Sequence, residues 1–275
     1  MSAEQTVFRF ARGDAPLLVS MPHVGTELPA GLADRLAAPA RALPDTDWHV
    51  DRLYDFAAGL GASLLRARYS RYLIDLNRPP DDAPLYPGSA GTGLIPTILF
   101  DGTSLYRDGL APDASEIAER VRTYWRPYHD HLARELERIR AKFGFALLFD
   151  AHSIRSVVPR LFDGRLPDIN LGTGGGTSAD EMLARALVGE CERQNGYDFV
   201  LNGRFKGGYI TRHYGKPANH VHAVQLELSQ RTYMHEDPPF DFDETLANRV
   251  RPLLRAVLAR MLDWAESRYR WRPRA

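Results

Sequence analysis

Short apolar runs along the chain mark the strands that the sequence predicts. Four runs have the length and composition of strands buried inside a sheet, and they cover residues 17–21, 62–67, 72–76 and 147–149. Proline or a polar residue follows each run, which is where a strand would end. We therefore expect the polar chemistry of the protein to gather at the ends of buried strands.

Longer segments between these runs have the periodicity of helices. The clearest helix covers residues 115–141, where apolar side chains recur at spacings of three and four and where Pro127 is expected to kink or divide the helix. Further helices are expected at residues 48–60, 178–195 and 243–269. Strands that alternate with helices indicate an α/β fold, and the length fits a single domain over residues 1–275.

Composition and charge exclude several classes of function. The 35 basic residues balance the 35 acidic residues, so no net field favours nucleic acid or an anionic membrane as a partner. A single cysteine, Cys191, excludes an internal disulfide and a cysteine-rich zinc site. No run approaches the roughly 20 apolar residues that span a bilayer, and residues 1–15 lack the apolar core of a signal peptide. We expect a soluble, cytoplasmic protein.

Two histidines that follow predicted strands are the first candidates for chemistry. His23 comes after the first run, in a turn with proline and glycine, and His152 comes after the fourth. One such histidine is more often structural, but two of them favour a metal site. Asp45 and Asp47 precede the helix at residues 48–60, where a carboxylate either caps the helix or supplies an oxygen ligand.

Arginines in two segments are candidate anchors for an anion. Asn77 and Arg78 follow the third run, and a planar guanidinium binds carboxylate through two parallel hydrogen bonds. The alternative for Arg78 is an ion pair with Asp81 or Asp82. Arg212 lies in a glycine-flanked segment among aromatic and hydroxyl side chains.

Residues 223–229 alternate apolar and polar side chains, so a strand there places Gln225, Glu227 and Ser229 on one face. A charge in the middle of a strand is costly if it is buried without a partner. Glu227 is therefore either solvated on an edge strand or a general base.

A glycine-rich stretch, residues 172–177, precedes the helix expected at 178–195. It lacks the lysine of a phosphate-binding loop, so the signal for a nucleotide is weak. We expect a turn here, or a lid that closes over a substrate.

Taken together, these residues predict metal-assisted hydrolysis. Two histidines and one carboxylate would leave one position of a tetrahedral Zn²⁺ open to water, whose pKa zinc lowers towards about 7. Glu227 would take the proton of that water, while Arg78 and Arg212 hold an acidic substrate. The expected reaction is hydrolysis of an amide in a small, negatively charged molecule.

Six motifs carry a resemblance to a known family, and they are SMPHVG (20–25), DTDWHVD (45–51), RYLIDLNR (71–78), DAHS (150–153), GYITR (208–212) and QLELS (225–229). As a set they resemble the N-formylglutamate amidohydrolase (N-formylglutamate deformylase) family, from about residue 17 to about residue 238. That family is similar in fold to the zinc carboxypeptidases and aspartoacylases. The resemblance implies a mixed, mostly parallel central sheet flanked by helices, which is zinc-carboxypeptidase-like (phosphorylase/hydrolase-like).

The resemblance also implies roles for single residues, with zinc ligands at His23 and His152, a carboxylate clamp at Asn77 with Arg78, and a base at Glu227. Zinc carboxypeptidases place a glutamate three residues after the first histidine, but Thr26 stands there in this chain. Asp47 is therefore the preferred second ligand, with Glu27 and Asp51 in reserve.

The implied reaction is hydrolysis of N-formyl-L-glutamate to formate and L-glutamate in bacterial histidine degradation. Arg78, Asn77 and Arg212 would hold the two carboxylates, and Arg71 or Arg155 would assist the oxyanion or a carboxylate. The expected cofactor is Zn²⁺, although such ligands also accept cobalt, iron or manganese. Two alternatives stay open: a zinc hydrolase of another N-acyl amino acid or a short acidic peptide, and a non-catalytic dicarboxylate-binding protein. Nothing in the sequence specifies an oligomeric state.

Overall fold

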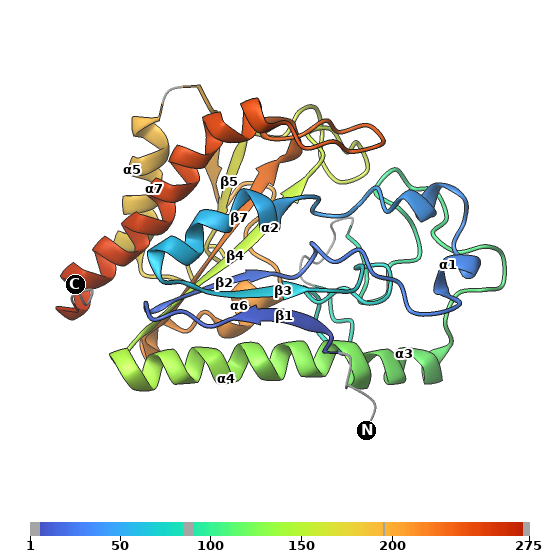
Figure 1. The fold of residues 1–275 in the computed structure, drawn as a ribbon, viewed down its shortest axis with the longest axis horizontal. Coiled ribbons are helices and arrows are strands. Elements are labelled where there is room, and N and C mark those ends of the chain that lie inside the picture. Colours follow the sequence, from blue (N-terminus) through green and yellow to red (C-terminus); the bar gives the residue numbers. More distant parts are fainter. Residues whose placement is uncertain (1–5, 85–90, 195, 272–275) are drawn as a thin grey trace.

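The computed structural model describes residues 6–84, 91–194 and 196–271, which fold around one seven-stranded sheet (Figure 1). The strand order is β1-β3-β2-β4-β7-β5-β6. Strands β3, β2, β4 and β7 run parallel to one another, whereas β1 is antiparallel to β3 and β5 is antiparallel to β7. The strands are β1 (Phe8–Ala11), β2 (Leu17–Met21), β3 (Ser63–Ala67), β4 (Ala146–Ile154), β5 (Ile169–Gly172), β6 (Phe199–Leu201) and β7 (Val221–Ser229).

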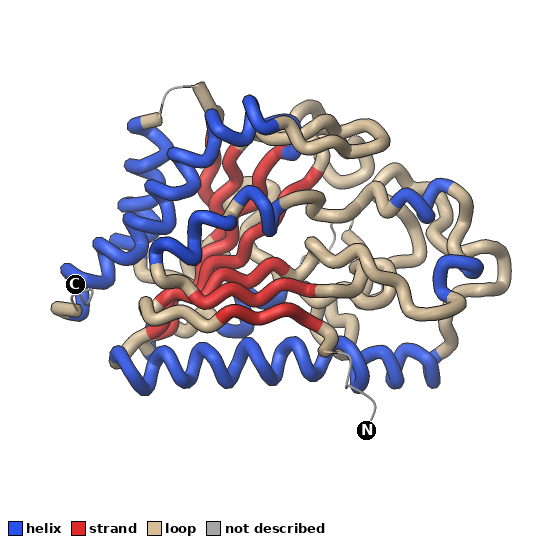
Figure 2. The backbone as a smooth tube through the Cα atoms, in the orientation of Figure 1, coloured by secondary structure: helices blue, strands red, loops and turns tan. Residues whose placement is uncertain are grey.

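Helices cover both faces of this sheet (Figure 2). They are α1 (Leu32–Arg35), α2 (Val50–Leu53), α3 (Ala114–Arg120), α4 (Arg126–Phe143), α5 (Glu181–Arg193), α6 (Tyr209–Tyr214) and α7 (Glu244–Tyr269). Among the described helices, none combines the length and the apolar composition that crossing a bilayer requires. The expected α/β class with a mixed, mostly parallel sheet is therefore confirmed.

The period-two alternation of β4 and β7 separates two cores. Leu147 and Phe149 of β4 pack with α5 and α7 on one face, together with Leu226 of β7. Leu148 of β4 packs with α4 on the other face, together with Ala223 of β7. Because side chains alternate along a strand, the residues two and four positions after Leu148 and Ala223 lie on this second face. They are Asp150, His152, Gln225 and Glu227.

A third, smaller apolar cluster lies apart from these two cores. Its buried members are Phe100, Ile154, Val158 and Leu166, and three half-buried side chains, Leu161, Phe162 and Phe205, pack against it. This group is called the satellite cluster below.

The strand predicted at residues 72–76 is wrong. The chain turns here instead, and the N–H of Leu73 donates to the carbonyl of Ser70 at 2.9 Å. The segment is apolar because its side chains are buried in the core beside α4, and these are Tyr72, Leu73, Ile74 and Leu76. Burial without strand pairing gives the same run of apolar letters, so the sequence alone does not separate the two cases.

The helix expected at residues 48–60 is shorter than predicted, and neither Asp45 nor Asp47 caps it. It divides into α2 and a 3₁₀ segment, Asp55–Leu60. His49 takes the N-cap position without a side-chain hydrogen bond. Asp45 instead accepts a hydrogen bond from the N–H of Phe100 at 3.0 Å, which leaves Asp47 for the site described below.

The other predicted helices are found, with small changes at their ends. The segment 115–141 forms α3 and α4 with a π-helical turn, Val121–Trp125, between them. The division is expected just before Pro127, which has no N–H to donate within the helix. Cys191 is buried in α5, and burial raises the pKa of its thiol to about 12, so it is no nucleophile at neutral pH.

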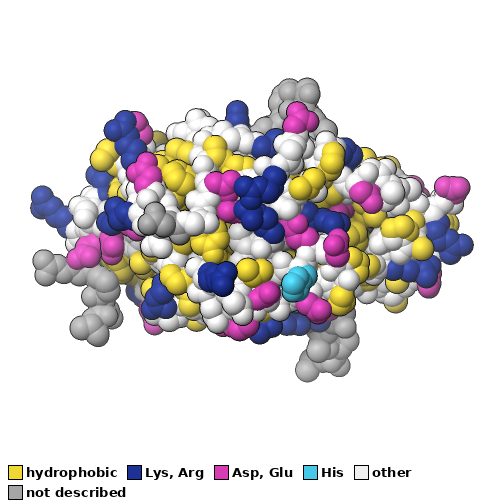
Figure 3. All heavy atoms as spheres, turned by 90° about the horizontal axis from the view of Figure 1, so that it is seen from above, with side chains coloured by type: hydrophobic (Ala, Val, Ile, Leu, Met, Phe, Trp, Pro, Cys, Tyr) yellow, Lys and Arg dark blue, Asp and Glu magenta, His cyan; other side chains and the backbone are white. Residues whose placement is uncertain are grey.

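Basic and acidic side chains are interspersed over the face of the molecule that Figure 3 shows. This mixture agrees with the equal numbers of the two charges in the chain. No extended patch of one charge sign is visible among the described side chains of that face.

Substitution of Phe149 directly tests the packing of the core between the sheet and α7. Its ring is fully buried and lies 5.6 Å from the ring of Tyr54. Phe149→Ala should lower the free energy of unfolding by about 3–5 kcal/mol, measured by urea denaturation. Met182→Ala on the exposed face of α5 should change it by no more than about 0.5 kcal/mol. A loss below about 1 kcal/mol for Phe149→Ala would contradict the assigned packing.

Candidate functional site

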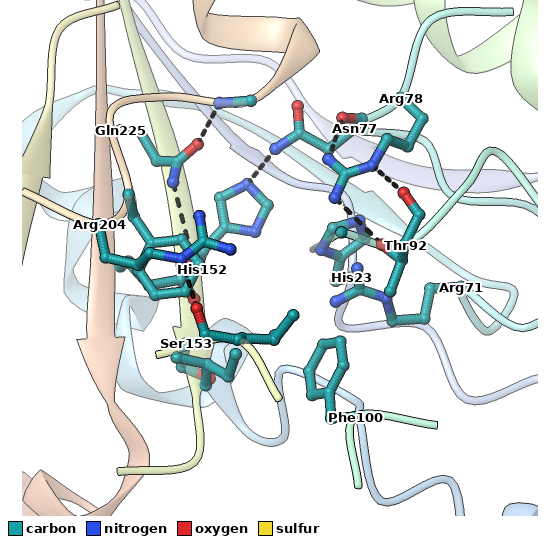
Figure 4. Close-up of a pocket in the computed structure, with 16 residues that line it drawn as sticks. His23, Arg71, Asn77, Arg78, Thr92, Phe100, His152, Ser153, Arg204 and Gln225 are labelled. Carbon is teal, nitrogen blue, oxygen red and sulfur yellow. Dashed lines mark hydrogen bonds between the residues drawn. The ribbon is translucent and has the colours of Figure 1, made fainter. Parts of the chain in front are cut away.

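One cavity opens at the carboxyl ends of the parallel strands (Figure 4). His152 of β4 and Glu227 of β7 are register partners, so their side chains stand next to each other on the same face of the sheet. His23 lies two residues beyond β2, and its side chain lines the same cavity. The sheet thus brings together three residues that are far apart in the sequence.

His23, Asp47 and His152 form a buried group that could hold a metal ion. One ligand atom from each lies within 4.8 Å of the others. Asp47 Oδ2 is 3.0 Å from His152 Nδ1 and 3.7 Å from His23 Nδ1. The backbone N–H of Asp47 donates to the carbonyl of His23 at 3.1 Å, which fixes the loop that carries the carboxylate. The two reserve ligands, Glu27 and Asp51, are not members of this group.

The surroundings of His23 fit a cation at this position. Its Nε2 donates to Asp75 Oδ1 at 2.7 Å. Burial, and next the charge of Arg71, lower the pKa of His23, so the ring is neutral at pH 7 and Nδ1 carries a lone pair. That lone pair faces the Asp47 carboxylate, an arrangement that a positive ion between the two atoms would stabilise.

His152 is held in a similar way by a second carboxylate. Its Nε2 lies 3.2 Å from Asp150 Oδ2 and 2.8 Å from Asn77 Nδ2. Burial alone would lower the pKa of His152, but the Asp150 and Asp47 carboxylates hold it well above its ordinary value. The site therefore favours positive charge at the atoms of His152 that face Asp47, and a divalent cation would supply it.

Asp75 is a further candidate for the site, and the sequence did not reveal it. Besides His23, it accepts a hydrogen bond from Arg71 Nη2 at 2.6 Å. Burial would raise the pKa of Asp75, but its neighbours His23 and Arg71 hold it well below its ordinary value, so it is ionised. The sequence offered no signal for Asp75, because residues 72–76 were predicted to form a strand and Asp75 was only a polar position within that apolar run.

Glu227 is buried in the cavity wall rather than solvated at an edge. Strand β7 lies between β4 and β5, so the edge-strand alternative is wrong. Burial raises the pKa of Glu227 to about 8, an effect that His152 opposes and the Asp47 carboxylate reinforces. Gln225 Nε2 lies 3.4 Å from Glu227 Oε2. A carboxyl group that titrates near neutral pH suits proton transfer in both directions.

Three residues of the predicted substrate-binding set line the cavity, and they are Arg71, Asn77 and Arg78. Arg78 is oriented by Thr92, whose carbonyl accepts from Nε at 2.6 Å and whose hydroxyl accepts from Nη2 at 3.0 Å. Asn77 Oδ1 accepts from the N–H of Ile210 at 2.8 Å, so this amide ties α6 to His152. Asn77 therefore has a positioning role in the structure.

The other two predicted arginines are not among the residues that line this cavity. Arg155 is directed to the surface, where Nη2 lies 3.1 Å from Asp237 Oδ1. Arg212 lies on α6, and its Nε donates to the carbonyl of Gly207 at 2.8 Å. Arg204 lines the cavity in their place, and no feature of the sequence had singled it out.

Comparison with known proteins finds a matching family and close relatives of this chain. The family model described as N-formylglutamate amidohydrolase matches residues 15–234. The chain is 56% identical to N-formylglutamate deformylase from Pseudomonas putida and 58% identical to N-formylglutamate deformylase from Pseudomonas aeruginosa, each over 96% of this chain and 98% of the relative.

A solved structure supports the fold independently. The crystal structure of N-formylglutamate amidohydrolase from Ralstonia eutropha JMP134 is similar with a TM-score of 0.80 and 28% identity, over 96% of this chain and 99% of that chain.

The hydrogen bond from His23 to Asp75 should strengthen metal binding. Asp75→Asn removes the negative charge behind the ligand, so the affinity for Zn²⁺ should fall about 10–100-fold. Competition with a chromogenic chelator measures the effect, and Asp237→Asn at the surface serves as the matched control. An unchanged affinity in Asp75→Asn would remove Asp75 from this role.

The raised pKa of Glu227 predicts a pH-dependent stability for the metal-free protein. The folded protein binds the Glu227 proton more tightly than the unfolded chain does. The contribution of this proton to folding stability is therefore fully present below the unfolded pKa and is lost as pH rises to about 8. Relative to Glu227→Gln, the wild type should lose on the order of 1 kcal/mol per pH unit between roughly pH 5 and pH 8. Urea denaturation with chelator present measures both proteins. A difference that does not change with pH would refute the raised pKa.

Proposed function

The chain belongs to the N-formylglutamate amidohydrolase family, and we propose that it hydrolyses N-formyl-L-glutamate to formate and L-glutamate with the help of a bound divalent metal, the closing step of one bacterial route of histidine degradation. The observation that carries this proposal is the register of β4 and β7. It sets the buried carboxyl group of Glu227 beside the group of His23, Asp47 and His152. A general base next to a candidate metal group is the arrangement that amide hydrolysis needs.

The metal is the one component that the chain itself does not supply. Held by His23, Asp47 and His152, a divalent ion such as Zn²⁺ would polarise the formyl carbonyl and acidify a water molecule. Imidazole and carboxylate ligands are those that zinc takes in hydrolytic sites.

Glu227 moves the proton in the proposed reaction. It takes a proton from the water that adds to the formyl carbon, and it delivers a proton to the nitrogen as the C–N bond breaks. Formate and L-glutamate are then released, the latter with a free amino group. Burial raises the pKa of Glu227 in the metal-free chain, which makes its carboxylate a stronger base towards the proton of the water.

Two cavity arginines serve the rest of the proposed substrate. Arg71 lies beside the metal group, with its guanidinium 5.0 Å from the centre of the Phe100 ring, and is placed to stabilise negative charge on the former carbonyl oxygen. Arg78, which Thr92 orients, would pair with the α-carboxylate. Asn77 supports both by holding α6 and His152 in place.

Formate release from N-formyl-L-glutamate tests the proposal. The purified protein should release formate, lose the activity on chelation and regain it with Zn²⁺. Glu227→Gln should lower kcat by about 10²–10⁴-fold while the metal stays bound. Glu181→Gln, on an exposed side chain at the start of α5, is the matched control and should leave kcat unchanged.

Two results would overturn this assignment. Metal-loaded protein that releases no formate but binds glutarate would favour a dicarboxylate-binding protein. Faster release of acetate from N-acetyl-L-glutamate than of formate would favour a hydrolase of larger acyl groups.

A further inference from the structure

The cavity contains an arginine, Arg204, that the proposed function does not use. Its side chain lines the cavity together with Phe205 and Leu161. Figure 4 places Arg204 on the other side of the cavity from Arg78 and Arg71, with its guanidinium directed inward. The cavity therefore has positive charge on two separate sides.

The position of Arg204 is fixed by contacts with its own surroundings. Its Nε donates to the carbonyl of Leu161 at 2.6 Å, and its guanidinium carbon lies 5.4 Å from the centre of the Phe205 ring. Phe205 in turn packs edge to face on Phe162 at 6.0 Å, within the satellite cluster. The Leu161 carbonyl and the Phe205 ring therefore orient the guanidinium of Arg204.

The glycine-rich stretch 172–177 holds the segment that carries Arg204. The N–H of Gly174 donates to the carbonyl of Lys206 at 2.6 Å, and Asn202 Oδ1 accepts from the N–H of Thr173 at 2.8 Å. A Cβ added to Gly172 would lie 2.7 Å from the backbone nitrogen of Gly207, so only glycine allows this approach. The stretch forms the turn that was one of the two expectations for it, and it contacts residues 202–207.

The charges of the cavity divide into two sets. Arg71 is paired with Asp75 at 2.6 Å and lies 3.9 Å from Asp47, so its charge balances the carboxylates around the metal group. Figure 4 places Arg78 and Arg204 on different sides of the cavity, whose lining also includes the apolar side chains Phe100, Ile154, Leu161 and Phe205. Methylene groups of a substrate would pack on these side chains while its two ends meet the two arginines.

We propose that Arg204 binds the side-chain carboxylate of the substrate and thereby sets the preference for acidic over neutral N-formyl amino acids. This inference rests on the proposed function, because the substrate class comes from it. It assigns to Arg204 the second clamp that the sequence had placed at Arg212.

Paired substrates that differ in one charge test the inference. N-formyl-L-glutamate and N-formyl-L-glutamine have nearly the same shape, and only the first carries a side-chain carboxylate. Arg204→Gln should lower kcat/KM for the glutamate substrate by about 10²–10³-fold and for the glutamine substrate by less than about threefold. Arg204→Lys should recover part of the lost selectivity, because it restores the charge without the planar fork. Arg185→Gln, an exposed arginine of α5, is the matched control.

Two outcomes would overturn the role of Arg204. An equal loss on both substrates would mean that Arg204 acts on a part common to them or on the fold. Loss of selectivity in Arg212→Gln, with selectivity kept in Arg204→Gln, would return the clamp to α6. Thermal unfolding of each variant accompanies the kinetics, and Arg204→Lys carries the test if Arg204→Gln is unstable.

A binding experiment separates this inference from the proposed function. Calorimetry on the metal-loaded protein compares glutarate with pentanoate, which lacks the second carboxylate. Wild type should bind glutarate more tightly, and Arg204→Gln should lose that preference. If no formate is released but this loss is seen, the proposed function fails and the inference stands. If formate is released but the preference survives in Arg204→Gln, or wild type does not discriminate, the inference fails.

Discussion

The parallel pairing of β4 with β7 is the constraint on which the site depends. Nine register pairs fix the two strands over their whole length, and one of them joins His152 to Glu227. A slip of β7 by one residue would move Glu227 to the face that packs against α5 and α7, where apolar residues fill the core. The alternation of both strands therefore does more than stabilise the sheet, because it keeps the carboxyl group of Glu227 beside His152.

The buried charges form a second level of constraint. Asp47, Asp75, Asp150 and Glu227 lie close together, although each carboxylate is costly to bury alone. Arg71 compensates Asp75, and both histidines lie between carboxylates. His23, Asp47 and His152 form a group that could hold a metal ion. A cation bound there would add positive charge among these buried carboxylates.

The sequence predicted the strands and ligands that depend on local pattern. Strand β2 and most of β7 were visible as apolar or alternating runs, and the polar residues at their ends were found with them. Arg155 is not among the residues that line the cavity, because it lies three residues beyond His152 and such side chains point to opposite faces of an extended chain. The sequence did not show this, because the apolar run at 147–149 does not reveal that the strand continues to Ile154.

Asp75 and Arg204 needed the tertiary structure. Asp75 stands in a buried segment whose apolar residues do not pair in the sheet, so its role behind His23 has no local signal. Arg204 is held at the cavity by its hydrogen bond to the carbonyl of Leu161, which is 43 residues away in the sequence. No window of neighbouring residues contains that contact.

The separation of the satellite cluster from the two main cores has an evolutionary consequence. Phe205 and Leu161, which flank Arg204, pack with the satellite cluster, whereas His152 and Glu227 belong to the central strands. Substitutions at Phe205 and Leu161 would therefore change the surroundings of Arg204 without removing a side chain from either main core. Variation at these positions would be a route to a different choice of acid with the same central strands.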